Sequence, residues 1–257
     1  MIVCNKCFFE IEEKFILRDD LKEFSDKPKL LLHSCCGPCS TAVVERLVDE
    51  FDVTVFFYNP CITEEDEYQK RLAAQMEFIE KFNRENIGRT RIWFMEGAHR
   101  PKDFFVEVKG LEGEPEGGAR CRVCFRQRLE KTAETASMMG FDYFGTTLTV
   151  SPHKDYKQIS ALGRELALRY DLSFLDRDFK KKDGFRRSVE LSRKYGLYRQ
   201  NYAFSIISLY SHLIELIFEL GISYFYPRTL HSERSGFHHS GAFQLPESID
   251  YHRSGYS

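Results

Sequence analysis

Short apolar runs alternate with longer amphipathic segments along most of this chain. Apolar runs of strand length cover residues 29–33, 52–58, 91–95 and 143–149. Helical periodicity covers residues 41–49, 63–82, 101–108, 121–139, 155–170 and 183–195. Strands that alternate with helices of this length are typical of βαβ units. The pattern therefore predicts an α/β fold of three layers, Rossmann-like, with a mostly parallel sheet.

The two ends of the chain depart from this pattern. Residues 1–28 form an N-terminal extension with one Cys-x-x-Cys pair, and residues 203–257 contain no lysine and five of the eight histidines. Residues 203–222 are apolar, but His212, Glu215 and Glu219 favour an amphipathic helix over a membrane span. We expect an extension (1–28), a catalytic α/β domain (29–202), and a divergent C-terminal helix with a poorly ordered tail (203–257).

The overall charge limits the classes of function. The 257 residues include 37 Lys and Arg against 39 Asp and Glu, a net charge of −2. This balance excludes a uniformly basic nucleic-acid-binding surface but allows a local basic patch. The N-terminus becomes acidic at once, so no secretory signal is readable. We expect a soluble, cytoplasmic protein without a membrane partner.

The eight cysteines are clustered rather than spread along the chain. Three Cys-x-x-Cys pairs occur, and no cysteine follows Cys124. In a cytoplasmic chain of this size, such clustering favours metal binding or redox chemistry over structural disulfides. Cys61 stands alone and receives no assigned role.

The first cluster contains Cys35, Cys36 and Cys39, where a predicted strand turns into a helix. Ligands of parallel sheets bind at this carboxyl edge of the strands. The start of a helix favours the thiolate form, which binds metals and attacks disulfides. The segment from Cys36 to Cys39, Cys-Gly-Pro-Cys, also matches the thioredoxin motif. A thioredoxin-like dithiol oxidoreductase using these two thiols is therefore one alternative.

The second cluster, Cys121 and Cys124, follows a glycine pair at the start of a predicted helix. A spacing of three residues places both thiols on one helix face, beside the same sheet edge. The two clusters supply four or five soft thiolates, enough for an iron–sulfur cluster or a zinc site. A zinc-binding RNA module is thus the second alternative. No phosphate-binding glycine loop is present, so machinery for nucleotide hydrolysis is absent from the sequence.

A basic stretch and a hydroxyl-rich loop complete the candidate chemistry. Basic residues interleaved with aromatic ones indicate a surface that meets phosphates and stacks on unpaired bases, although a solvated helix face fits the composition equally well. These basic residues are Lys180, Lys181, Lys182, Arg186, Arg187 and Arg199. The loop over 146–155, which contains His153 and Asp155, follows a predicted strand and is placed to hold a polar substrate.

Five motifs resemble those of one family. Residues 33–39, 57–60, 117–129, 147–154 and 197–202 are similar, in order, to the cobalamin-independent epoxyqueuosine reductases, the QueH family. The resemblance implies a fold like that of the nucleotide α-hydrolases. It implies an enzyme that reduces epoxyqueuosine to queuosine at the wobble position of tRNA, an oxidoreductase of queuosine biosynthesis. A 4Fe-4S cluster, an additional mononuclear iron and an external electron donor are implied as well.

The resemblance also assigns expected roles to residues. Cys35, Cys36, Cys121 and Cys124 are expected to be the core metal ligands, and Cys39 to complete either the cluster or the second iron. Removing the epoxide oxygen consumes two electrons and two protons, so an electron source and a Lewis acid are needed. We expect His153 or Asp155 to deliver protons, while the basic stretch holds tRNA phosphates and the unpaired base enters the site.

One departure from the family is visible after Tyr202. Members of the family continue with Cys-Gly-Cys, whereas this chain continues with Ala203, Phe204 and Ser205. Two hypotheses follow: the C-terminal sequence is altered, or Cys4 and Cys7 supply replacement thiols.

Overall fold

A single parallel sheet organises the fold. The computed structural model describes residues 26–87 and 91–199. The strands are β1 (Lys29–Ser34), β2 (Asp52–Phe57), β3 (Trp93–Glu96), β4 (Tyr143–Thr146) and β5 (Ser173–Phe174). Their order is β3-β2-β1-β4-β5, and every neighbouring pair is parallel. The predicted α/β class with a mostly parallel sheet is confirmed. The sequence pattern missed β5, because two residues are too short to show a periodicity.

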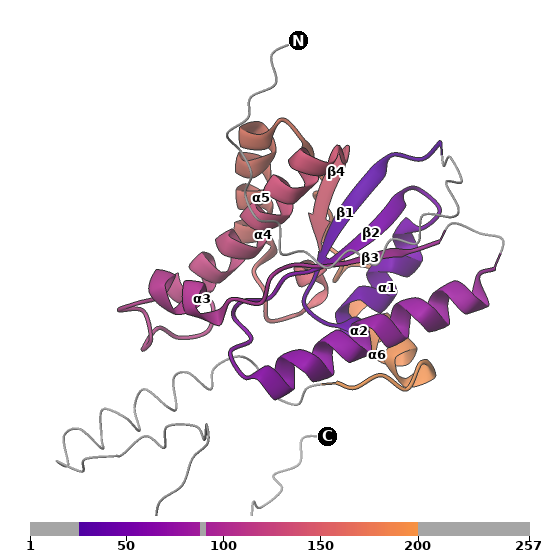
Figure 1. The fold of residues 1–257 in the computed structure, drawn as a ribbon, viewed down its shortest axis with the longest axis horizontal. Coiled ribbons are helices and arrows are strands. Elements are labelled where there is room, and N and C mark those ends of the chain that lie inside the picture. The colour runs from indigo at the N-terminus through magenta and orange to yellow at the C-terminus, as the bar shows by residue number, and fades with distance from the viewer. Residues whose placement is uncertain (1–25, 88–90, 200–257) are drawn as a thin grey trace, which may run out of the picture. The chain divides into compact units, whose positions relative to one another are not determined.

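Helices cover both faces of this sheet. They are α1 (Gly37–Leu47), α2 (Glu65–Glu85), α3 (Pro101–Glu107), α4 (Ala119–Met139), α5 (Tyr156–Tyr170) and α6 (Gly184–Lys194). Figure 1 shows α4 and α5 on one side of the strands and α1, α2 and α6 on the other. The three predicted layers are therefore present.

Two apolar cores lie between the layers. Along β1, Leu30 and Leu32 face α1, α2 and α6, while Leu31 faces α4 and α5. This alternation follows from the two-residue repeat of a strand, and both faces are apolar because helices cover both. All three leucines are fully buried. The apolar run of β1 thus fixes the central strand between two helical layers.

Some predicted boundaries are wrong by a few residues. α1 begins at Gly37 rather than at residue 41, because Pro38 suits the first turn of a helix, where its missing N–H costs no hydrogen bond. α2 begins at Glu65 rather than at residue 63, with Glu64 at its N-cap position. The apolar run 143–149 divides into β4 and a 3₁₀ turn, η1 (Leu148–Val150).

The strand order creates a switch point at the centre of the sheet. The chain leaves β1 for β2 on one side, and β4 pairs with β1 on the other side. In open parallel sheets, ligands bind outside the carboxyl ends of the strands at such a point. The loop that carries Cys35 and Cys36 leaves the carboxyl end of β1 there. Its predicted position at this edge is confirmed.

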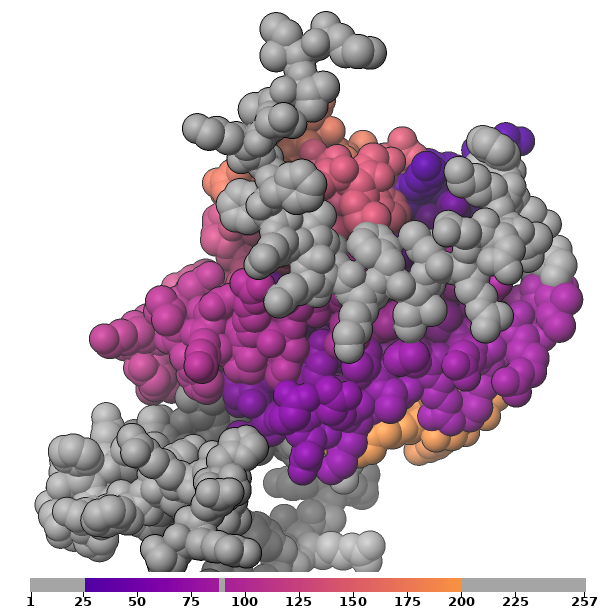
Figure 2. All heavy atoms as spheres, in the orientation of Figure 1, coloured from indigo at the N-terminus to yellow at the C-terminus, as the bar shows by residue number. Residues whose placement is uncertain are grey.

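α2 and α6 contact each other in the described part of the chain. Figure 2 shows α2 as a broad violet band, with the orange α6 segment beneath it. An ion pair between Lys194 and Glu85 joins the two helices.

Within residues 26–87 and 91–199, no helix combines the length and the apolar character that crossing a membrane requires. The predicted C-terminal part (203–257) and most of the predicted extension (1–28) lie outside these residues, so the three-part division stays a prediction.

Candidate metal centre

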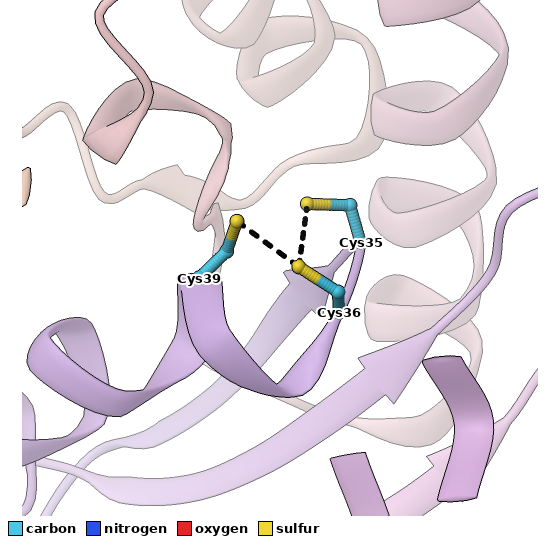
Figure 3. A group of neighbouring side chains, drawn as sticks. All are labelled: Cys35, Cys36 and Cys39. Atoms are coloured by element: carbon cyan, nitrogen blue, oxygen red, sulfur yellow. Dashed lines mark hydrogen bonds between the residues drawn. The ribbon is translucent and has the colours of Figure 1, made fainter. Parts of the chain in front are cut away.

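Three thiols converge where β1 passes into α1. The Sγ atoms of Cys36 and Cys39 are 3.1 Å apart, and those of Cys35 and Cys36 are 3.9 Å apart. The three sulfur atoms lie within 4.8 Å of one another and point toward each other (Figure 3). Cys36 is buried, while Cys35 and Cys39 are partly exposed. The earlier start of α1 places Cys39 in its first turn, which brings its thiol over the loop.

Contacts from α2 hold this cysteine loop from behind. A Cβ atom on Gly37 would lie 2.4 Å from the carbonyl oxygen of Ala74, so glycine allows the start of α1 to touch the backbone of α2. The hydroxyls of Ser34 and Ser40 both donate to Oε1 of Gln75, at 2.7 and 3.1 Å. The two serines flank the three cysteines in sequence. Gln75 thus ties both ends of the loop to one buried point on α2.

His33 fixes the carboxyl ends of three strands. Its Nε2 donates to the carbonyl oxygen of Tyr58 at 3.1 Å, because a carbonyl can only accept. Its Nδ1 therefore accepts from the hydroxyl of Thr146, 2.9 Å away. Burial lowers the pKa of His33 to about 3, so the ring is neutral at physiological pH. His33 is a structural tie between β1, β4 and the segment after β2.

The electrostatics of the three thiols favour a thiolate at Cys35. Hydrogen bonds from the thiols of Cys36 and Cys39 hold the pKa of Cys35 well below its usual range; burial opposes this, and the Arg128 guanidinium assists it. The contact with Cys35 correspondingly raises the pKa of Cys36 and of Cys39. The thiolate is the form of cysteine that binds soft metal cations.

The other thiols in the described residues, those of Cys61, Cys121 and Cys124, have different partners. Cys124 packs against a small apolar cluster of Cys61, Phe104 and Val108. The interaction between the two thiols lowers the pKa of Cys61 to about 6, against the effect of burial, and raises the pKa of Cys124. Cys121 instead accepts a hydrogen bond from the backbone N–H of Gly117 at 3.2 Å.

Arg128 connects the two groups of thiols. Its Nη2 donates to Sγ of Cys124 at 3.0 Å, and its Nε donates to the carbonyl oxygen of the same residue. The guanidinium is buried and also acts electrostatically on Cys35 and Cys61. Cys35 and Cys121 pack against the same apolar cluster under α4. Cys35 of the first predicted cluster and Cys121 of the second therefore lie on the same side of the sheet, whereas Cys39 packs against the core on the other side.

The two residues predicted to deliver protons lie in the loop between η1 and α5. Asp155 is the N-cap of α5: its carboxylate accepts from the backbone N–H groups of Lys157 and Gln158. A hydrogen bond from the Gln158 side chain contributes most to lowering the pKa of Asp155. His153 is exposed. These contacts support a capping role for Asp155, and proton delivery by either residue stays a prediction.

The basic stretch lies between β5 and α6 and along α6. The Lys180 ammonium donates to the carbonyl oxygen of Lys154, so this stretch reaches the loop that follows η1. Lys181 and Lys182 are exposed. Arg187 forms a two-bond ion pair with Glu45 of α1, and Arg186 pairs with Asp183. Arg199 stacks over the ring of Phe185 at 5.4 Å. Arg186 and Arg187, two of the six residues predicted to contact phosphates, thus already pair with carboxylates.

Three residues of this centre were missed by the sequence reasoning. Arg128 stands four residues after Cys124, which places both on one helix face, so the spacing on α4 could have indicated it. Gln75 and Cys61 had no such local signal, because their partners are far away in the chain. Cys4 and Cys7, the predicted replacement thiols, lie outside the described residues, as does the sequence after Arg199.

The fold and the thiols together define a class. This is a Rossmann-like α/β protein whose switch point carries a cluster of thiols with a buried cationic partner. Soft metals and electron-transfer clusters are bound by such donor sets.

Comparison with known proteins identifies the family. The family model for "Epoxyqueuosine reductase QueH" matches residues 30–210. A protein of that name from Streptococcus pyogenes serotype M1 is 43% identical over 193 residues, 75% of each chain. One from Haemophilus influenzae is 37% identical over 195 residues (75% of this chain, 76% of its own). One from Thermotoga maritima is 31% identical over 181 residues (70% and 90%). The chain belongs to the epoxyqueuosine reductase QueH family, so the predicted family and its oxidoreductase class are confirmed.

Proposed function

We propose that this chain reduces epoxyqueuosine to queuosine at the wobble position of tRNA, as a step of queuosine biosynthesis. Membership of the family supports the reaction. The observation that carries the proposal in this chain is the convergence of Cys35, Cys36 and Cys39 at the switch point of the sheet. In the overall change, two electrons and two protons convert the epoxide to an alkene, and the epoxide oxygen leaves as water. The electrons come from an external donor.

We propose iron as the metal of this centre, in a 4Fe-4S cluster with an additional mononuclear iron. The donor set fits, because thiolates are the ligands of iron–sulfur clusters and three of them already lie within 4.8 Å of one another. Cys35, Cys36 and Cys39 would hold the metal together with Cys121 and Cys124. When bound, the iron supplies single-electron transfer and a Lewis acid for the departing oxygen.

The protein's own residues prepare this centre. Arg128 balances the negative charge of the thiolates, which costs less free energy than leaving them buried without a cation. Gln75 and His33 hold the cysteine loop and the strand ends in place. We propose that His153 or Asp155 delivers the protons. Both lie on the loop that follows η1, and both are exposed.

We propose that the basic stretch holds the phosphates of the anticodon loop. Lys180, Lys181 and Lys182 lie in the loop after β5, which ends at the same sheet edge as the thiols. Arg186, Arg187 and Arg199 extend this surface along and beyond α6. A single unpaired nucleotide can then enter the centre while its neighbours stay bound through their phosphates.

The central experiment is anaerobic incubation with tRNA that carries epoxyqueuosine and a low-potential reductant. Digestion and mass spectrometry are expected to show a nucleoside that has lost one oxygen atom. Unchanged epoxyqueuosine with a fully iron-loaded chain would refute the proposed reaction.

The ligand assignment has its own test. Cys121→Ser, purified without oxygen, is expected to lose the brown colour and the visible absorbance of the cluster. Cys61→Ser is the matched control, since it also removes one thiol beside α4 and is expected to keep both. Full colour in Cys121→Ser would remove Cys121 from the ligand set.

The tRNA surface can be tested by charge reversal. Lys181→Glu with Lys182→Glu is expected to weaken tRNA binding and to lower the salt dependence by about two ions, with iron content unchanged. Lys70→Glu with Lys131→Glu changes the net charge equally on α2 and α4 and serves as the control. Equal binding by both double variants at every salt concentration would favour a solvated face instead.

A further inference from the structure

Cys61 is a buried thiol that the proposed reaction does not use. It follows β2 directly after Pro60, and its exposed fraction is 3%. Its side chain packs with Phe104 and Val108 in one apolar cluster, and the side chain of Cys124 packs against that cluster. The two cysteines are 63 residues apart in the chain (124 − 61), so the fold alone creates this pair.

The surroundings of the pair favour sulfur chemistry. Arg128 donates to Sγ of Cys124 at 3.0 Å and acts electrostatically on Cys61. Disulfide formation needs two sulfur atoms near each other, and a thiolate acts as its nucleophile. Cys124 is partly exposed, so a small oxidant has access to the pair from its side. Proximity, a cationic partner and access are therefore all present.

We propose that Cys61 and Cys124 form a reversible disulfide in the iron-free protein, with a peroxide as the oxidant. The thiolate of the pair attacks one oxygen of hydrogen peroxide, the O–O bond breaks, and hydroxide leaves a sulfenic acid. The second thiol attacks that sulfur, the S–O bond breaks, and water leaves. Two electrons pass from the sulfurs to the peroxide oxygens, and the products are one disulfide, one water and one hydroxide.

The disulfide has a consequence for the metal centre. This consequence rests on the proposed function, in which Cys124 is a metal ligand. A sulfur in a disulfide is no longer a thiolate, so Cys124 cannot bind iron until a thiol reductant reverses the bond. Cys61 is then an oxidation site that protects Cys124 from irreversible oxidation while the protein lacks iron, and it is not a ligand itself.

Peptide mapping tests the disulfide directly. The full-length iron-free chain is treated with hydrogen peroxide, alkylated, digested with trypsin without reduction, and analysed by mass spectrometry. Cleavage after Arg120 and Arg122 separates Cys121 from Cys124, which falls in peptide 123–126. Cys61 falls in peptide 47–70, and Cys35, Cys36 and Cys39 stay together in peptide 30–46. The expected product joins peptide 47–70 to peptide 123–126 and disappears on treatment with dithiothreitol.

Two single-cysteine variants test whether Cys61 itself is the partner of Cys124. Cys61→Ser is expected to abolish this product, and the matched variant Cys121→Ser is expected to retain it. A product that joins peptide 123–126 to peptide 30–46, or no joined product at all, would overturn the proposal. Loss of iron from Cys61→Ser loaded under reducing conditions would also overturn it, because Cys61 would then be a ligand. The mapping needs neither iron nor tRNA, so its outcome is independent of whether the chain reduces epoxyqueuosine.

Discussion

A single added methyl group at Gly37 tests the idea that α2 sets the geometry of the cysteine loop. A Cβ atom there would meet the backbone of α2 at three points: 2.4 Å from the oxygen of Ala74, 2.7 Å from its carbonyl carbon and 3.0 Å from the nitrogen of Gln75. These atoms belong to the middle of a long helix and cannot rotate away. The oxygen would have to move by about 1.0 Å to reach an ordinary contact of 3.4 Å.

The expected cost follows from this displacement. Overpacking typically destabilises by about 1–3 kcal/mol, and rigid backbone neighbours place Gly37→Ala in the upper half of that range. The lower entropy of the unfolded alanine chain offsets up to about 1 kcal/mol. The net loss of about 1–3 kcal/mol corresponds to a Tm lower by about 2–12 °C. A shift of 1 Å also exceeds the tolerance of about 0.5 Å for a preorganised site, so iron content should fall.

Thermal unfolding followed by circular dichroism and iron analysis after anaerobic reconstitution measure the two effects. Gly113→Ala is the matched control, since a Cβ at Gly113 would have no neighbour within 4 Å. The control is expected to keep the wild-type Tm and iron content. A Gly37→Ala variant that matches the control in both measurements would refute the role assigned to the contact between α1 and α2.

Three further predictions test other contacts. Asp155→Ala removes the N-cap of α5 and should lower the Tm by about 2–4 °C, whereas Asp155→Asn can still cap the helix and should keep the wild-type Tm. If the stable Asp155→Asn variant loses turnover, Asp155 delivers a proton. Gly163→Ala places a Cβ 2.3 Å from the ring of Phe174 and should destabilise by about 1–3 kcal/mol in urea unfolding, and an unchanged midpoint would contradict this packing. Arg128→Met should release iron to a chelator about 10- to 100-fold faster than wild type, and Arg128→Lys should release it at an intermediate rate. Equal release rates in all three proteins would show that the thiolates need no cation.

The sequence determined the fold class and the place of the first thiol cluster. Leu30, Leu31 and Leu32 form an unbroken apolar run, which is typical of a strand covered on both faces. The cysteines follow this run at once, so their position at the carboxyl edge required no tertiary information. The five-motif resemblance to the QueH family depends on the same local patterns and is confirmed.

Local patterns also misplaced some features. The strand prediction across residues 143–149 was wrong at its end, because apolar content does not distinguish a strand from the 3₁₀ turn at Leu148–Val150. The basic stretch suggested six cations available for phosphates, but Arg187 lies against Glu45 of α1, a partner that no spacing rule connects to α6.

Which thiol meets which was decided by the tertiary structure. The sequence grouped Cys121 with Cys124, but successive turns of α4 direct the first toward the apolar cluster that Cys35 contacts and the second toward Cys61. Gln75 and Cys61 reach the centre from segments that are distant in sequence from their partners. A spacing rule reports neighbours along one helix or strand, whereas these contacts depend on how the helices cross the sheet. The physical reason is that the helices cross the sheet so as to bury apolar surface on both of its faces. This buried surface is a sum over many segments, so no single local pattern determines the crossings.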